Sequence, residues 1–301
     1  MNERIAMSYF PAPPERQARV FARLPEAFRT PRTNEWTRFN ARGRALHSLL
    51  EGPAFDAQGN LYVTDVPFGR IFRIDGQGNW SLVAEYDGWP NGLKIGPDGR
   101  IYIADYKRGL LELDPVAGRV HVLAARYLSE GFKGINDLCL TPEGDILFTD
   151  QGQTGLQDAS GRVFRWSAQG RLTRVLDGIP SPNGIAYDAA ERILYVAVTR
   201  AQQIWRIPLH EDDQIGKAGV FAQLHGGPGG PDGIVLDGQG GLLVAHAGVG
   251  TVWHLDALAR PRARIQSPAG LVVTNLAFSA DGRLFVTEAQ DAVVLEVAIG
   301  P

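Results

Sequence analysis

Six polar, oxygen-bearing residues stand at equivalent places in a repeated sequence pattern. Each opens a short apolar segment, which is followed by a turn containing Gly or Asp and by a second apolar segment. Carboxylate, amide and hydroxyl oxygens are the donors that hard divalent cations prefer, and two carboxylates would match the charge of one such ion. If the six side chains meet in space, they therefore form a candidate cation site. The six are Glu51, Asn91, Asn136, Asn183, Asp232 and Thr274.

The repeat itself predicts the elements that position these residues. The second apolar segment of each copy stops at Asp65, Asp105, Asp150, Val198, His246 and Glu288, which lie 40, 45, 48, 48 and 42 residues apart. Two further runs with alternating apolar residues follow in each copy, which is typical of β-strands. Four strands per unit at this period indicate a β-propeller. We therefore predict an all-β, six-bladed β-propeller with four antiparallel strands per blade, and one domain over residues 1–301. The recurring Asp at the stop position predicts a repeated structural hydrogen bond.

The two ends of the chain predict how the ring closes. The sixth unit ends after its third strand, Ala292–Ala298, whereas the strand-like segment Gln17–Arg23 precedes the first unit and has no partner there. Pairing these two segments in the last blade removes the open sheet edges. Residues 1–14 are then an N-terminal arm, and residues 24–46 connect to the first blade over one face of the ring.

In a propeller the first strand of each blade lines the central channel, so the six residues are expected to converge at one mouth of it. An alternative is turn chemistry, because Asn or Asp followed by Gly favours tight turns. This alternative accounts for Asn91, Asn183 and Asp232. It accounts poorly for Glu51 and not at all for Asn136 and Thr274.

Four motifs resemble those of the gluconolactonase/regucalcin (senescence-marker-protein) family, in order and in approximate spacing. The resemblance covers nearly the whole chain and implies one divalent metal held by Glu51, Asn183 and Asp232, with Asn136 at metal-bound water or substrate. It also implies hydrolysis of sugar lactones, with other lactones and some phosphotriesters as further substrates. The motifs are Glu51-Gly-Pro, Asn136-Asp, Ser181-Pro-Asn-Gly184 and Gly230-Pro-Asp-Gly233.

The chemistry of such a site is consistent with lactone hydrolysis. The oxygen donors favour Ca²⁺, while Mg²⁺, Mn²⁺ and Zn²⁺ also fit. A bound cation would polarise the lactone carbonyl and stabilise the oxyanion that forms on attack. Asp232 is then both a metal ligand and the general base for the attacking water. A serine hydrolase is not expected, because the sequence contains no G-x-S-x-G motif.

Substrate contacts are expected from residues beside the metal. Asn136 and Asn91 would hold ring oxygens of the substrate, and Gln151 opens a long loop that would border the channel mouth. His246 ends the equivalent strand of the fifth blade, where a structural histidine is the alternative interpretation.

One position departs from the family pattern. Animal members that prefer sugar acids have Arg at the position of Gly134, and the neighbouring Lys133 is the candidate replacement. A flexible ammonium does not reproduce a bidentate guanidinium. The departure therefore bears on the sugar part of the substrate and not on lactone hydrolysis itself.

Composition narrows the class of partner. The net charge of −3, from 30 basic and 33 acidic residues, provides no broad attraction to nucleic acid or to an anionic membrane. The N-terminus lacks the apolar stretch of a secretory signal, and no segment approaches the roughly 20 apolar residues of a membrane span. We expect a soluble cytoplasmic protein that acts on a small-molecule lactone. The single cysteine, Cys139, excludes zinc sites built on several thiolates and is expected to be buried and inert.

Two alternatives to a sugar lactonase stay open. The same metal site could hydrolyse phosphotriesters or non-sugar lactones, which the departure at Gly134 allows. The chain could also be a non-catalytic propeller that binds a metabolite or Ca²⁺. The native lactone, the metal used in the cell and the oligomeric state do not follow from the sequence.

Overall fold

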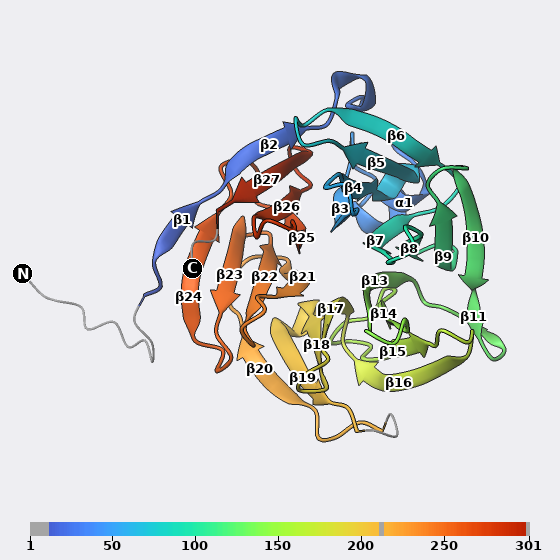
Figure 1. The fold of residues 1–301 in the computed structure, drawn as a ribbon, viewed down its shortest axis with the longest axis vertical. Coiled ribbons are helices and arrows are strands. Elements are labelled where there is room, and N and C mark those ends of the chain that lie inside the picture. The colour runs from blue at the N-terminus through green and yellow to red at the C-terminus, as the bar shows by residue number, and fades with distance from the viewer. Residues whose placement is uncertain (1–11, 211–213, 299–301) are drawn as a thin grey trace, which may run out of the picture.

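Six β-sheets surround a common axis in the computed structural model, which describes residues 12–210 and 214–298 (Figure 1). Each sheet is a blade with antiparallel strands running from the axis outward, so the predicted six-bladed propeller is confirmed. The first blade contains β3 (Leu50–Phe55), β4 (Leu61–Asp65), β5 (Arg70–Ile74) and β6 (Trp80–Glu85). The second contains β7 (Pro90–Ile95), β8 (Ile101–Asp105), β9 (Gly109–Asp114) and β10 (Arg119–Ala124).

The next two blades repeat this order, and the last two also receive strands from the start of the chain. The third blade contains β13 (Ile135–Leu140), β14 (Ile146–Asp150), β15 (Gly161–Trp166) and β16 (Leu172–Ile179). The fourth contains β17 (Pro182–Asp188), β18 (Ile193–Val198), β19 (Gln203–Pro208) and β20 (Gly219–Gln223). The fifth contains β21 (Gly230–Leu236), β22 (Leu242–Ala247), β23 (Thr251–Leu255) and β24 (Pro261–Gln266). The sixth contains β25 (Val273–Phe278), β26 (Leu284–Glu288) and β27 (Val293–Val297), and a short hairpin of β11 (Arg126–Tyr127) and β12 (Glu130–Gly131) follows the second blade.

The N-terminal strand closes the ring, as predicted. β2 (Arg19–Arg23) pairs antiparallel with β27, so that Arg19 lies opposite Glu296 and Arg23 opposite Val293. Figure 1 shows β2 along the outer edge of the sixth blade. This pairing gives the last blade its fourth strand.

The predicted start of the closing strand was wrong. Gln17 belongs to β1 (Glu15–Gln17), which pairs parallel with β24 and makes a fifth strand on the fifth blade. Ala18 continues this contact, because its N–H donates to the Gln266 carbonyl at 3.0 Å. Part of the predicted arm, residues 1–11, lies outside the described residues, and the Pro14 carbonyl at its end already accepts a hydrogen bond from the Arg264 N–H.

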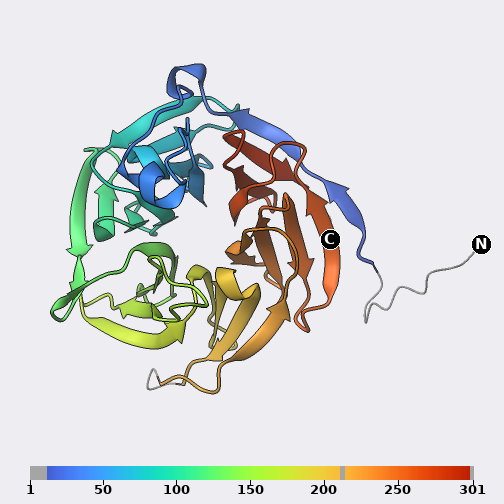
Figure 2. The same cartoon turned by 180° about the vertical axis from the view of Figure 1, so that it is seen from behind.

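The segment between β2 and β3 covers one face of the ring, as predicted (Figure 2). It contains η1 (Glu26–Phe28) and the short helix α1 (Glu35–Asn40), which begins with a capping box between Asn34 and Thr37. Trp36 and Ala41 are buried against Val66 of the first blade, so the helix is anchored to that blade by packing. Within the described residues, no helix is long and apolar enough to cross a membrane.

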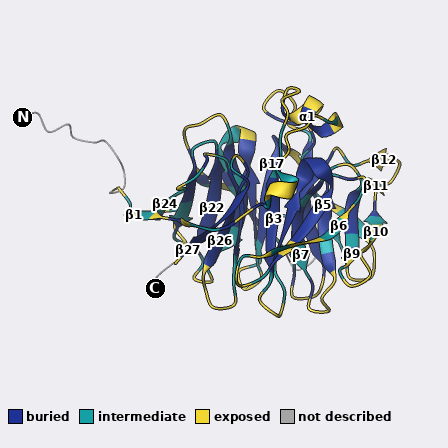
Figure 3. Cartoon of the chain, turned by 90° about the horizontal axis from the view of Figure 1, so that it is seen from above, coloured by how far each residue is buried: buried dark blue, intermediate teal, exposed yellow. Residues whose placement is uncertain are grey.

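The hydrophobic core lies between neighbouring blades. Figure 3 shows that the strands are mostly buried, whereas the connecting loops are mostly exposed. Ala54 and Ile71 of the first blade pack with Leu93 and Ile103 of the second, for example. The last junction has the same form, because Phe285 and other residues of the sixth blade pack with the first. Each blade therefore depends on both neighbours for the burial of its two faces.

Threonine hydroxyls connect four of the six blade junctions near the axis. Each donates to a carbonyl of the first strand of the next blade and so fixes the relative position of the two inner strands. The pairs are Thr64 with Asn91 O (2.8 Å), Thr149 with Asn183 O (2.7 Å), Thr199 with Pro231 O (2.8 Å) and Thr274 with Leu50 O (2.8 Å).

Carboxylates at the stop positions make the structural hydrogen bonds that their recurrence predicted. Asp65 Oδ1 accepts from Leu49 N–H at 3.0 Å, and Asp150 Oδ1 accepts from Gly134 N–H at 2.9 Å. Both contacts join the end of a second strand to the residue just before the first strand of the same blade.

Deleting residues 1–23 should strongly destabilise the protein, because it removes β2 and exposes the edge of β27. It also removes Phe21, whose ring lies edge-on to Phe285 at 5.1 Å. We expect a melting temperature lower by about 10 °C or more in thermal unfolding. Deletion of residues 1–17 is the control, because it removes β1 and keeps β2. Equal melting of the full chain and the Δ1–23 chain would contradict the closure.

Candidate active site

The six innermost strands share a local distortion at the site. In each of them the pairing with the second strand shifts next to the polar residue, for example between Glu51 and Ala54 and between Pro231 and Ile234. Such bulges re-aim side chains. Gly92 stands in a strand at this point, and a Cβ there would lie 2.1 Å from Asp137 Oδ1. The glycine allows close approach of the neighbouring strand, so the turn explanation for these Asn-Gly and Asp-Gly pairs is wrong.

Three carboxylates from three blades meet near the axis. Glu51 and Asp137 are buried, whereas Asp232 is half-buried. Asn275 connects two of them, because its Nδ2 donates to Glu51 Oε2 at 3.0 Å and to Asp137 Oδ2 at 3.3 Å. Glu51 Oε2 also accepts from Gly52 N–H at 2.7 Å. The first, third and sixth blades are thus joined by side chains at the centre of the ring.

The environment of these carboxylates favours their neutral forms when no cation is bound. Burial, and next the charge of Asp137, raise the pKa of Glu51 to about 7. Burial, followed by the charges of Glu51 and Asp137, raises the pKa of Asp232 well above its usual range. Burial also raises the pKa of Asp137. A cation bound among them would reverse this effect, because opposite charge favours the ionised forms.

Asn183 supplies the observation that fits a cation. Its side chain hydrogen-bonds to Asp232, yet its Oδ1 is buried without a hydrogen-bond partner, as is the Oδ1 of Asn91. Unpaired buried oxygens are costly and unusual in folded proteins. In residues 12–210 and 214–298, no three His, Cys, Asp or Glu side chains form a metal cluster. A cation here would therefore use amide as well as carboxylate oxygens, and the donors Glu51, Asn183 and Asp232 fit one.

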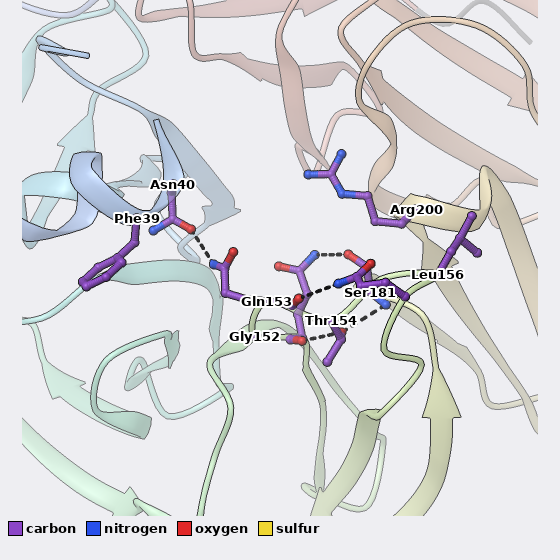
Figure 4. Close-up of a pocket in the computed structure, with 10 residues that line it drawn as sticks. Phe39, Asn40, Gly152, Gln153, Thr154, Leu156, Ser181 and Arg200 are labelled. Carbon is purple, nitrogen blue, oxygen red and sulfur yellow. Dashed lines mark hydrogen bonds between the residues drawn. The ribbon is translucent and has the colours of Figure 1, made fainter. Parts of the chain in front are cut away.

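The structure brings two of the predicted substrate-binding residues, Asn136 and Gln151, into contact. Asn136 Nδ2 donates to Gln151 Oε1 at 2.8 Å, and Gln151 Nε2 donates to Ser181 Oγ at 3.0 Å. Gln151 and Ser181 also line a pocket of about 460 Å³ beside the site (Figure 4). Asn136 is buried and lies outside the pocket lining, and its hydrogen bond to Gln151 joins it to the pocket wall.

The loop that follows Gln151 forms much of the pocket wall, and α1 forms another part. Gln153 Nε2 donates to Asn40 Oδ1 at 2.9 Å, which ties the loop to the helix, as Figure 4 shows. The side chains of Phe39 and Leu156 are exposed at the rim. The pocket therefore combines neutral polar groups with two apolar side chains.

Of the five predicted substrate-binding residues only Gln151 lines the pocket, whereas Asn136, Asn91, Lys133 and His246 do not. Lys133 is exposed and is not among its lining residues. His246 is fully buried, and both ring nitrogens are engaged, because Nδ1 accepts from Trp253 Nε1 at 3.2 Å and Nε2 lies 3.1 Å from Gly226 O. Burial lowers the pKa of His246, so this geometry agrees with the structural interpretation of the histidine. Asn91 lies near the axis, as predicted, but outside the pocket lining.

Thr274 was wrongly counted among the residues that face the mouth. Its hydroxyl lies between blades, where it donates to Leu50 O and contacts Thr287 Oγ1 at 2.8 Å. The next residue, Asn275, is the one that reaches Glu51 and Asp137.

Sequence reasoning also missed Asp137, Arg200 and the residues of α1. Asp137 stood within a quoted motif, Asn136-Asp, and its acidic side chain beside an apolar run was an available signal. Arg200 and Phe39 lie outside the repeat pattern, so nothing in the spacing marked them.

Cys139 agrees with its prediction, because it is buried and burial raises the pKa of its thiol to about 12.

Tyr106 explains why Gly134 carries no side chain. A Cβ on Gly134 would lie 2.6 Å from the Tyr106 ring, and the backbone there has φ of 142°. Tyr106 is held in place by a hydrogen bond with Gln153 Nε2 at 2.8 Å and by packing against Trp89. An arginine at this position would have to displace the tyrosine.

The comparisons with known proteins agree with the fold and the motifs. A model of the SMP-30/gluconolactonase/LRE-like region matches residues 49–290, and the chain therefore belongs to this family. The gluconolactonase of Zymomonas mobilis is 29% identical over 221 residues, which cover 67% of this chain and 62% of that protein. The lactonase drp35 of Staphylococcus aureus strain USA300 is 30% identical over 240 residues, which cover 73% of this chain and 70% of that protein.

A solved structure supports the same assignment. The calcium-binding protein regucalcin from Agrobacterium tumefaciens superposes with a TM-score of 0.72 at 25% identity, covering 83% of this chain and 90% of that one. The family resemblance inferred from the four motifs is thus confirmed. The chain spans less than two thirds of the length of the Zymomonas relative.

Replacing Gly134 with Ala should destabilise the protein by about 1–3 kcal/mol, because the new methyl group overlaps the Tyr106 ring. Chemical denaturation would measure this change. Gly131→Ala is the matched control, because a Cβ on Gly131 meets nothing within 4 Å. In the double variant with Tyr106→Ala the overlap is relieved, so the two free-energy changes should sum to more than the measured total. A Gly134→Ala protein as stable as the Gly131→Ala control would refute the steric explanation.

Proposed function

We propose that this protein is a lactonase that hydrolyses its substrate beside one divalent cation held by Glu51, Asn183 and Asp232. The observation that carries the proposal is the unpaired, buried Asn183 Oδ1 next to two carboxylates whose charges repel each other. The named activities of the Zymomonas and Staphylococcus relatives support the reaction class.

Ca²⁺ is the expected ion, since all the donors are oxygens, and Mg²⁺, Mn²⁺ or Zn²⁺ would also be accepted. When bound, the cation would polarise the ester carbonyl of the lactone. The regucalcin neighbour, titled a calcium-binding protein, supports calcium as the first candidate.

The residues of this chain have distinct tasks in the proposed reaction. Asp232 takes a proton from water, whose oxygen bonds to the carbonyl carbon. The ring C–O bond then breaks, and the ring oxygen accepts a proton to give a hydroxy acid. Asp232 is suited to this task because it is half-buried, with part of its surface open. Asn136 donates one N–H of its amide to Gln151, which orients the group. Its second N–H then donates to a substrate oxygen.

A non-catalytic calcium-binding role is the second candidate, and the regucalcin neighbour is the specific observation that favours it. The pocket beside Asn136 and Gln151 argues for catalysis, because binding a cation alone does not need it. An assay of acid release from a panel of lactones, with and without chelator, decides between the two. Phosphotriesters are assayed in a separate arm.

Asn183→Ala should weaken metal binding by about tenfold or more, since outer-shell partners alone cost about 10–100-fold. Isothermal titration with Ca²⁺ measures the affinity. Asp281→Asn removes a carboxylate at an exposed turn and is the control, with affinity unchanged. If the wild-type protein binds no divalent cation stoichiometrically, the metal site is refuted.

Asp232→Asn should reduce turnover by about 10²–10⁴-fold, the usual contribution of general-base catalysis, even at saturating metal. Asn183→Ala should regain part of its activity as metal is added, because its defect lies in metal binding. Kinetics of both variants across a metal titration test this difference. Wild-type turnover of Asp232→Asn at saturating metal would show that Asp232 is only a ligand.

A further inference from the structure

The pocket beside the site contains one positive charge. Its described lining residues are neutral apart from Arg200, whose guanidinium extends from η3 (Thr199–Ala201) toward the space between the fourth blade and α1 (Figure 4). The polar groups on the other walls belong to amides and hydroxyls, including Gln151, Gln153 and Ser181. No carboxylate in the described lining neutralises the arginine.

Arg200 is held in place and still has donors to spare. Its Nη1 donates to Pro228 O at 3.2 Å, and within the described residues it forms no ion pair. A guanidinium has five N–H donors, so one hydrogen bond leaves most of them free. The backbone places Arg200 close to the reacting groups, because Thr199 Oγ1 donates to Pro231 O at 2.8 Å and these two residues directly precede Arg200 and Asp232.

The backbone under Arg200 is rigid. Thr199 Oγ1 donates to Pro231 O at 2.8 Å, and Gln202 Nε2 donates to Gly229 O at 2.9 Å. Gly230 packs directly on Thr199, because a Cβ on this glycine would lie 2.3 Å from Thr199 O. The backbone that carries Arg200 is therefore fixed, while its exposed side chain is oriented by the hydrogen bond to Pro228 O.

The other side of the pocket provides no such charge. Gly134 is kept without a side chain by the Tyr106 ring, and Lys133 is not among the lining residues. Any anionic group on a substrate would thus be recognised from the fourth blade. A single guanidinium carries one positive charge and can bind a carboxylate through two parallel hydrogen bonds. It matches the single charge of a carboxylate better than the double charge of a phosphate dianion.

We infer that the substrate is a lactone that carries a carboxylate substituent and that Arg200 binds this carboxylate while the ester carbonyl faces Asp232. The inference rests on the proposed lactonase function and narrows its substrate class. Arg200 is a specificity-determining residue, because it contacts the substituent and takes no part in bond breaking. Hydrolysis of such a lactone gives a hydroxy dicarboxylate.

Steady-state kinetics with two matched γ-lactones test the inference. One is 5-oxotetrahydrofuran-2-carboxylate and the other is its neutral carboxamide, which keeps the ring and nearly the same shape. For the wild-type protein we expect kcat/KM to favour the carboxylate by about tenfold to a hundredfold, mainly through KM, as is usual for hydrogen bonds to charged groups. In Arg200→Ala the ratio between the two lactones should fall to near one, and Arg200→Lys should recover part of it.

Arg174→Ala is the control, because Arg174 is an exposed arginine that pairs with Asp177 away from the pocket. This variant should keep the wild-type ratio. A wild-type protein without preference for the carboxylate, or a preference that survives in Arg200→Ala, would overturn the inference.

A binding measurement separates this inference from the proposed function. The ketone 3-oxocyclopentanecarboxylate and its carboxamide have a CH₂ group in place of the ring oxygen and cannot be hydrolysed. Calorimetric titration should show the same preference for the carboxylate and its loss in Arg200→Ala. If neither lactone is hydrolysed but this preference is found, the lactonase assignment fails and carboxylate recognition stands. Equal affinities for the two ketones would overturn recognition by Arg200.

Discussion

Repulsion among three carboxylates at the axis of the ring is the constraint on which the arrangement of the site depends. Glu51, Asp137 and Asp232 come from different blades, and burial removes the water that would otherwise screen their charges. Asn275 and Asn183 donate hydrogen bonds to them, and the positive charge of Lys94 acts on Glu51 and Asp137. These contacts offset the repulsion only in part, which is why a site of this kind suits a divalent cation.

The fold meets this constraint by fixing the innermost strands relative to one another. A pairing shift in every first strand turns the polar side chains toward the axis, and threonine hydroxyls join neighbouring strands on the side of the core. Thr149 is an instructive case, because it holds the carbonyl of Asn183, whose side chain is a proposed ligand. The position of a ligand in one blade is thus set by a side chain in the previous blade.

Sequence periodicity was sufficient for the fold because each blade repeats the same burial requirement. It also put the proposed ligands Glu51, Asn183 and Asp232 at one place in the repeat, and the three lie on the innermost strands of their blades. It failed where function depends on a single blade or on contacts between blades: Thr274 was chosen by register although Asn275 reaches the axis. The role of Gly92 and Gly134 could not be read locally either, since the atoms that exclude a side chain there belong to Asp137 and Tyr106.

The substrate pocket was the least predictable part of the site for the same reason. Its walls come from α1, the loop after β14 and η3, which lie outside the repeating strands and far apart in sequence. Only the folded ring brings Asn40 and Gln153 into contact. Elements that vary from blade to blade can therefore alter what the pocket accepts, while the repeated strands keep the centre unchanged.

The pairing of β2 with β27 has a consequence for how the protein is made. Arg19 is synthesised before the first blade, whereas its partner Glu296 is added more than 270 residues later. Blades one to four can pair their own strands as they emerge, but the sixth blade cannot be completed until β27 has followed the five other blades. During that interval β2 is a strand without its partner and is open to pairing with another chain. The order of the chain thus makes closure of the ring, rather than formation of the first blades, the stage at which it is most exposed to misassembly.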